Sequence, residues 1–166
     1  CVGRNYAAHA AEMGVEVDRE APFYFTKTST HALESNATIP YPPGTTNFHF
    51  EMELALVIGQ PVFQATHDQA AAAIWAYGCA LDMTRRDLQL AARAKQRPWD
   101  LGKDVEASAV FGPLTMASDF GQIKDQRIAL KVNGAVRQQS KLSLMIHSCV
   151  DIVQDLSRYY HLAPGD

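Results

Sequence analysis

Hydrophobic and polar residues alternate most regularly between residues 47 and 60, which read NFHFEMELALVIGQ. Period-two spacing places successive side chains on opposite faces of a β-strand. One face is apolar throughout, whereas the other begins with polar residues and becomes apolar at Ala55 and Val57. A strand that is apolar on both faces at one end is normally buried. We therefore expect Glu51 and Glu53 to lie in or beside the core.

Buried carboxylates need compensation, because an unpaired one costs several kcal/mol and tends to take up a proton. Two of them on the same strand face, at Glu51 and Glu53, therefore indicate a nearby cation. The alternative is an exposed strand on which both acids of the Glu-x-Glu pattern lie in solvent.

A second apolar stretch, residues 77–83 (YGCALDM), predicts another buried strand, interrupted only by Asp82. A helix is expected before it, over residues 66–75, because Thr66 and Gln69 form a T-x-x-Q capping box. Residues 84–87 are expected to begin a further helix, and residues 99–106 to form a loop. Cys79 is expected to be a small core residue within its strand.

The C-terminal third predicts a hairpin followed by a helix. Asn133-Gly134 is a strong two-residue hairpin signal between residues 128–132 and 135–139. Ser148 and Asp151 are expected to start a helix whose apolar stripe comprises Ile152, Val153, Leu156, Tyr159 and Tyr160. Strands, a hairpin and scattered helices together favour an α+β fold over strict βαβ alternation.

Composition adds few constraints beyond these elements. The chain has 166 residues, 47% of them hydrophobic, and a net charge of −3. This predicts one domain over residues 1–166, or one domain with a small appendage, without the basic surface that nucleic acid or anionic membrane requires. Three widely spaced cysteines and no apolar run of membrane-spanning length lead us to expect a cytoplasmic protein. A start at Cys1 and an end in a turn at residues 162–166 lead us to expect that both termini are truncated.

The candidate metal ligands are Glu51, Glu53 and Asp82, which are all oxygen donors on segments that otherwise read as core strands. Oxygen ligands without cysteine or clustered histidine select Mg²⁺, Mn²⁺ or Ca²⁺ rather than zinc. Three protein ligands on an octahedral ion leave positions open for a substrate. The alternative for Asp82 is a role as the N-cap of the helix that follows, and the spacing alone does not decide between the two.

Two further pairs share helix faces at i, i+3 spacing. His9 with Glu12 could form a general base and its orienting carboxylate, or be an ordinary surface pair. Arg86 with Gln89 could bind a carboxylate or carbonyl, or be a solvated helix face. Arg86 and Lys103 supply positive charge that would let an anionic substrate bind near the three acids.

Four blocks of the sequence, in this order, resemble the fumarylacetoacetate hydrolase family, in its acylpyruvase and fumarylpyruvate hydrolase branch. They read CVGRNYAAHAAEMG, FHFEMELALVIG, YGCALDMTRRDLQ and PWDLGKDVE, and the similarity covers almost the whole chain. The resemblance implies a mixed β-sheet roll with peripheral helices. It also implies a homodimer and a bound Mg²⁺ or Mn²⁺.

The resemblance assigns a role to each candidate position. It implies that Glu51, Glu53 and Asp82 are the metal ligands and that Arg86, Gln89 and Lys103 contact the substrate. Lys103 is also expected to act in catalysis, by stabilising negative charge on an oxygen. The family's catalytic dyad falls on His9 and Glu12, within a lid-like segment formed by residues 1–22.

The activity implied is metal-dependent hydrolysis of the carbon–carbon bond of an acylpyruvate, best fumarylpyruvate to fumarate and pyruvate, in aromatic-compound catabolism. The alternatives are an isomerase or decarboxylase of a 2-oxo or 2-hydroxymuconate-type diacid, and an inactive, metal-stabilised family member. Three features depart from the branch pattern. Phe50 follows His49 where the branch has His-His-Glu, the loop at residues 31–39 is shorter, and the TGTP segment after Pro-Gly-Asp is absent.

Overall fold

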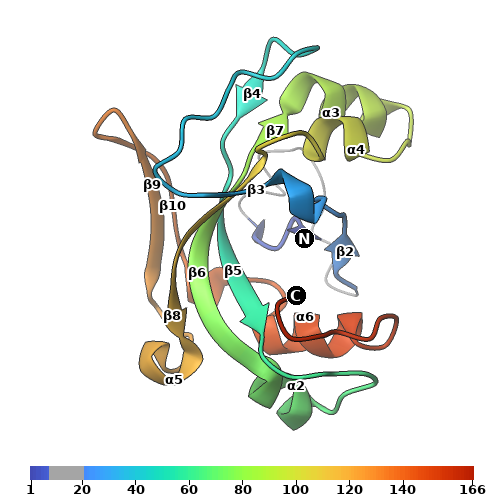
Figure 1. The fold of residues 1–166 in the computed structure, drawn as a ribbon, viewed down its shortest axis with the longest axis vertical. Helices are drawn as coiled ribbons and strands as arrows, with labels where there is room; N and C mark the ends of the chain where they lie inside the picture. The colour runs from blue at the N-terminus through green and yellow to red at the C-terminus, as the bar shows by residue number, and fades with distance from the viewer. Residues whose placement is uncertain (8–20) are drawn as a thin grey trace.

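A four-stranded mixed sheet forms the centre of the molecule, in a computed structural model that describes residues 1–7 and 21–166. The strand order is β3 (Ala32–Glu34), β8 (Ala109–Met116), β6 (Ile74–Asp82) and β5 (Met52–Ile58). β3 runs parallel to β8, and the other neighbours are antiparallel. Helices lie at both ends of the curved sheet (Figure 1), so the predicted α+β roll with peripheral helices is confirmed.

The stretch expected to be one strand is divided in two. β4 (Phe48–His49) pairs with β7 (Thr84–Arg85), and β5 begins only at Met52 and pairs with β6. Phe50 and Glu51 form the connection between the two sheets. The Asp82 N–H donates to the Glu51 carbonyl at 2.9 Å, and Glu53 lies opposite Ala80. Antiparallel pairing thus brings the Glu-x-Glu segment beside Asp82.

Two capped helices close one end of the sheet. α2 (His67–Ala73) and α6 (Cys149–Leu156) each begin with the predicted capping box, at Thr66 with Gln69 and at Ser148 with Asp151. Their inner faces pack on Ile58 and Ile74 in the main hydrophobic core. Both helices end earlier than expected: β6 already begins at Ile74, and α6 stops at Leu156. The expected apolar stripe is therefore wrong at its end, where Tyr159 and Tyr160 are exposed.

Two helices at the other end carry the candidate substrate-binding residues. α3 (Arg86–Ala94) begins where predicted, but residues 100–103 form the short helix α4 (Asp100–Lys103) rather than a loop. A Cβ on Gly102 would lie 2.8–2.9 Å from backbone atoms of Gln89. Glycine at this position therefore lets α4 pack directly against α3, which brings Lys103 towards the acids.

The remaining elements are short strands and turns around the sheet. β9 (Arg127–Val132) and β10 (Ala135–Lys141) form the predicted hairpin, with Asn133 at φ 51° and Gly134 at φ 80°, as a type I′ turn requires. The N-terminal ribbon consists of β1 (Val2–Gly3) and β2 (Phe23–Tyr24). One helical turn, α5 (Ala117–Phe120), follows β8, and 3₁₀ turns occupy Ser29–His31 and Leu142–Leu144.

Two further expectations are corrected. Cys79 is exposed rather than a core residue, although it lies in β6, a central strand of the sheet. β3 and β8 were not expected from the alternation pattern. Across the described residues, no helix combines the length and apolar character needed to cross a membrane.

Candidate metal centre and active site

Three carboxylates converge at the edge of the central sheet. Glu51 immediately precedes β5, Glu53 lies within it, and Asp82 is the last residue of β6. One ligand oxygen from each lies within 4.8 Å of the other two. Glu51 and Asp82 are buried and Glu53 is largely covered. The Glu-x-Glu pattern therefore does not belong to a solvated edge strand. Asp82 is not a helix N-cap either, because Arg85 occupies that position in α3.

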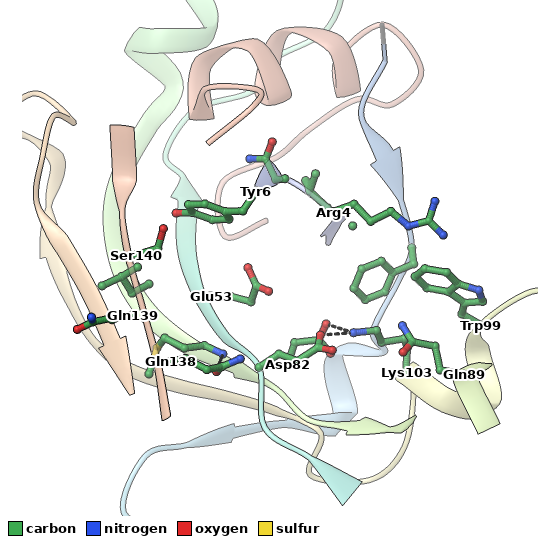
Figure 2. A pocket seen from close by; sticks show the side chains of 17 residues that line it. Arg4, Tyr6, Glu53, Asp82, Gln89, Trp99, Lys103, Gln138, Gln139 and Ser140 are labelled. Atoms are coloured by element: carbon green, nitrogen blue, oxygen red, sulfur yellow. Dashed lines mark hydrogen bonds and ion pairs between the residues drawn. The ribbon is translucent and has the colours of Figure 1, made fainter. Parts of the chain in front are cut away.

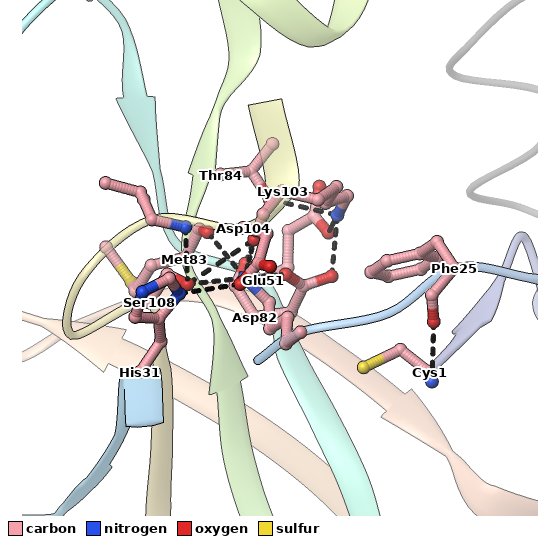
Figure 3. A network of polar contacts seen from close by, with 12 residues as sticks. Cys1, Phe25, His31, Glu51, Asp82, Met83, Thr84, Lys103, Asp104 and Ser108 are labelled. Carbon is pink, nitrogen blue, oxygen red and sulfur yellow. Dashed lines mark hydrogen bonds and ion pairs between the residues drawn. The ribbon is translucent and has the colours of Figure 1, made fainter. Parts of the chain in front are cut away.

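Basic side chains neutralise two of the three acids. Arg86 Nη2 donates to Glu51 Oε1, and Lys103 Nζ bridges Glu51 Oε2 at 2.5 Å and Asp82 Oδ2 at 2.6 Å. Figure 3 shows this network around Glu51, Asp82 and Lys103. Burial alone raises the pKa of Glu51, but Lys103 and Arg86 outweigh it and hold the pKa below its ordinary value. Burial leaves the pKa of Asp82 raised despite its basic neighbours.

Glu53 is the acid without a cation. No described residue forms an ion pair or side-chain hydrogen bond with its carboxylate, and it faces the cavity in Figure 2. Burial, and then repulsion from Glu51 and Asp82, raises the pKa of Glu53 from 4.5 to about 8. Glu53 therefore holds a proton near neutral pH, although it lies beside two other acids. This indicates that the cluster of three acids lacks a cation. The donor set fits a hard divalent cation, whose charge would hold all three acids ionised.

Lys27 belongs to the charged cluster at the three acids, and sequence reasoning missed it. Its ammonium lies 2.9 Å from Asp82 Oδ1 and donates to the carbonyl oxygens of Met83 and Lys103 and to Ser108 Oγ. The side chain is only 5% exposed. A signal was present, since Lys27 closes the aromatic run FYFTK, in which a lysine is expected to be buried with a counter-ion. Burial lowers the pKa of Lys27, and Asp82 opposes that effect.

Contacts of Lys103 itself and of the next residue, Asp104, hold Lys103 in place. Asp104 accepts hydrogen bonds from the Thr28 N–H at 2.8 Å and interacts with His31 Nδ1 at 2.7 Å. Lys103 Nζ also donates to Thr84 Oγ1 at 2.9 Å and lies 4.8 Å from the centroid of the Phe25 ring. The lysine therefore has a defined position at the acids.

Arg86 and Gln89 meet as their spacing predicts, with Arg86 Nη1 donating to Gln89 Oε1. They are the buried residues of α3, so this face is not solvated. Gln89, Lys103 and Glu53 line one cavity together with Arg4, Tyr6 and Trp99 (Figure 2). His9 and Glu12, with most of the predicted segment 1–22, lie outside the described residues, and their role stays a prediction.

Comparison with known proteins identifies the family. The model for the fumarylacetoacetate (FAA) hydrolase C-terminal family matches residues 1–166. The chain belongs to this family. It is 50% identical to a fumarylpyruvate hydrolase of Ralstonia sp over 157 residues, which cover 93% of this chain and 81% of that protein. It is 36% identical to an oxaloacetate tautomerase of Escherichia coli (strain K12), covering all of this chain and 76% of that protein.

Solved structures of family members have the same fold. The crystal structure of fumarylpyruvate hydrolase from Pseudomonas aeruginosa, in complex with Mn²⁺ and pyruvate, superposes with a TM-score of 0.91 at 43% identity. All of this chain and 73% of that chain are covered. A fumarylacetoacetate hydrolase family protein from Yersinia pestis CO92 matches with a TM-score of 0.91 at 33% identity, covering 100% of this chain and 76% of that one.

Proposed function

We propose that this family member is a metal-dependent hydrolase that cleaves the carbon–carbon bond of an acylpyruvate, with fumarylpyruvate as the best substrate. The observation that carries the proposal is the convergence of Glu51, Glu53 and Asp82 beside Lys103 in an accessible cavity. Relatives named fumarylpyruvate hydrolase support the choice of substrate.

The metal is Mg²⁺ or Mn²⁺, held by Glu51, Glu53 and Asp82. All three donors are carboxylate oxygens, which these hard ions prefer, and the Pseudomonas aeruginosa relative contains Mn²⁺. When bound, the ion supplies Lewis-acid polarisation of the substrate and stabilises developing negative charge.

The charges around the site suit a dianionic substrate. Three acids face three basic side chains, Lys27, Arg86 and Lys103, so the ionised cluster has no net charge before a metal binds. A dication then gives the cluster a net charge of about +2. Fumarylpyruvate carries two carboxylates, and its binding would restore neutrality. A neutral substrate would leave this excess charge uncompensated in a partly buried site.

Arg86 and Gln89 hold the pyruvyl carboxylate, and Lys103 stabilises negative charge on an oxygen as it develops. His9, oriented by Glu12 on the lid-like segment 1–22, removes a proton from water. The resulting hydroxide attacks the acyl carbonyl carbon, and the bond between that carbon and the pyruvyl methylene breaks. Its electron pair passes to the pyruvate enolate, which takes up a proton to give pyruvate. The whole chain, residues 1–166, serves as one catalytic domain.

A homodimer in the cytoplasm, acting in aromatic-compound catabolism, completes the proposal. Large apolar side chains along β6 and β8 are 41–49% exposed, at Trp75, Phe111, Leu114 and Met116, and such surfaces commonly mark subunit contacts. All three cysteines are free, which suits a reducing compartment. Light scattering of the purified protein should give twice the mass of the chain.

Isomerisation or decarboxylation of a related diacid is the second candidate. The observation that favours it is the 36% identity to an enzyme named oxaloacetate tautomerase. Enolate stabilisation by the same residues would serve that chemistry without attack by water. The third possibility is an inactive, metal-stabilised family member.

A substrate panel separates these functions. Fumarylpyruvate, acetylpyruvate and oxaloacetate are incubated with the protein and Mg²⁺ or Mn²⁺, with and without chelator, and pyruvate, tautomer and CO₂ are measured. The proposal predicts chelator-sensitive release of pyruvate and fumarate in equal amounts. Tautomer or CO₂ formation without fumarate would support the second candidate. Metal-dependent melting without turnover of any substrate would support the third and overturn the proposal.

A further inference from the structure

The cavity at the three acids has two chemically different sides. The side formed by α3 and α4 presents Gln89 and Lys103, the groups assigned to the pyruvyl end of the substrate. The opposite side is formed by β10 and the N-terminal segment, with Gln138, Ser140 and Tyr6 (Figure 2). These three side chains are polar but uncharged. The charged residue of the N-terminal segment, Arg4, also lines the cavity but is directed towards the Trp99 ring on the other side. A substrate whose pyruvyl end lies on the first side extends its acyl group towards the second.

Gln138 is held in one orientation by the backbone of β5. The Met52 N–H, between the two glutamates, donates to Gln138 Oε1 at 2.9 Å. This hydrogen bond fixes which end of the amide is the oxygen, so the NH₂ group faces away from Met52. Among the described residues, none accepts a hydrogen bond from that NH₂ group. The β9–β10 pairing is irregular between Val136 and Gln138, and such bulges redirect side chains next to functional sites.

Tyr6 contributes a second donor without a partner. Its hydroxyl oxygen is buried and has no hydrogen-bond partner in the described part of the chain. In Figure 2 the hydroxyl points towards the β10 side of the cavity. Burial, and then the nearby Glu53, raises the pKa of Tyr6 to about 12, so the hydroxyl keeps its proton. A buried donor left unsatisfied is costly, which favours a ligand that supplies the acceptor.

We propose that the Tyr6 hydroxyl and the Gln138 amide NH₂ bind the far end of the acyl group and select acyl groups that end in a carboxylate. This assignment rests on the proposed hydrolase function and deepens it. Two unpartnered donors suit a carboxylate, because its two oxygens can each accept a hydrogen bond from one of them. An acyl group that ends in methyl would leave both donors desolvated and unpaired, and sites of this kind reject such analogues strongly.

Two substitutions test the assignment with two substrates. Tyr6→Phe removes only the hydroxyl. Gln138→Glu keeps an oxygen to accept from the Met52 N–H but replaces the NH₂ donor with an acceptor. We expect kcat/KM for fumarylpyruvate to fall about 10-fold or more in Tyr6→Phe and about 100-fold in Gln138→Glu. For acetylpyruvate, which lacks the second carboxylate, both variants should stay within about threefold of wild type.

The controls separate a binding role from a structural one. Gln122→Glu adds the same charge at an exposed site outside the cavity and should leave both substrates unaffected. The melting temperature and Mn²⁺ affinity of Tyr6→Phe, which changes no charge, should match wild type, which shows that the acids keep their positions. A further variant, Gln138→Leu, loses both the bond to Met52 and the NH₂ donor, and its kcat/KM for acetylpyruvate reports the structural contribution.

The pattern of losses decides the outcome. Losses confined to fumarylpyruvate support the assignment. Equal losses on both substrates, or no loss on either, would overturn it, because the donors would then serve a shared part of the substrate or none. Wild-type protein that hydrolyses neither substrate would overturn the proposed function itself, and the assignment with it. Wild-type turnover and the ratio between the substrates are therefore separate readouts.

Discussion

Replacing Glu53 by glutamine in the metal-free protein should make the protein more stable, although it removes a proposed metal ligand. Glu53 lies beside Glu51 and Asp82 and has no cation of its own among the described residues. Glutamine has nearly the same shape and cannot ionise. The substitution therefore removes a repulsion that only a bound cation would otherwise relieve.

The magnitude follows from the pKa of Glu53, which burial and the two neighbouring acids raise from 4.5 to about 8. Because the folded state binds this proton more tightly than the unfolded state does, the stabilisation is fully present below pH 4.5 and is lost as pH rises towards 8. The slope is about 1.4 kcal/mol per pH unit. Between pH 5 and pH 8 the metal-free wild type should therefore lose about 3–4 kcal/mol relative to the variant. Domains of this size have total stabilities of about 5–15 kcal/mol.

Urea unfolding of chelator-treated protein at pH 5.5, 7 and 8 measures the difference. Other titrating groups are common to wild type and Glu53→Gln and cancel between them. Glu106→Gln, at an exposed site, controls for loss of a surface charge and should follow wild type. Added Mg²⁺ or Mn²⁺ should then stabilise wild type and leave Glu53→Gln nearly unchanged. Parallel pH profiles of the two metal-free proteins, or an equal response to metal, would refute the reasoning.

Three further predictions concern stability and reactivity. Lys27→Met should lower the free energy of unfolding by about 3–5 kcal/mol in urea titrations, because it leaves buried Asp82 without one of its two ammonium partners. Iodoacetamide at pH 8 should alkylate exposed Cys79 well before Cys149, because burial raises the pKa of the Cys149 thiol to about 11. Peptide mass mapping over time shows which cysteine is alkylated first. Ser148→Ala should cost about 1 kcal/mol in the same titrations by removing the cap of α6, and Ser148→Asp should restore most of it.

The parts of the fold that the sequence predicted are those with a strong local signal. Alternation identified β5, and a continuous apolar run identified most of β6. The capping boxes identified the starts of α2 and α6, and Asn133-Gly134 identified the hairpin. The misses have tertiary causes. β3 is three residues long and is a strand only because it pairs with β8. Residues 100–103 become helical where Gly102 packs against α3, a contact that no local pattern records.

The site was predictable from its acids and less so from its cations. Glu51, Glu53 and Asp82 were conspicuous because carboxylates are out of place on apolar strands. Lys27 was missed, because its only signal is its place at the end of the aromatic run FYFTK, and a polar loop follows it directly. Arg86, Gln89 and Lys103 were only candidates from the sequence pattern, and the family resemblance assigned their roles. The structure brings them to the acids without testing those roles. For His9 and Glu12 the prediction stands as the resemblance gave it.

The two lysines at Asp82 differ in how firmly they are held, and this difference separates their roles. Besides Asp82, Lys27 donates to two backbone carbonyls and to Ser108, none of which is a proposed metal ligand. Lys103 depends on Glu51 and Asp82, with Thr84 as its only neutral side-chain acceptor in the described chain. A dication at the three acids repels both ammonium groups but takes over the partners of Lys103. We therefore predict that Lys27 stays at Asp82 as its counter-ion, and that metal binding frees Lys103 to act on the substrate.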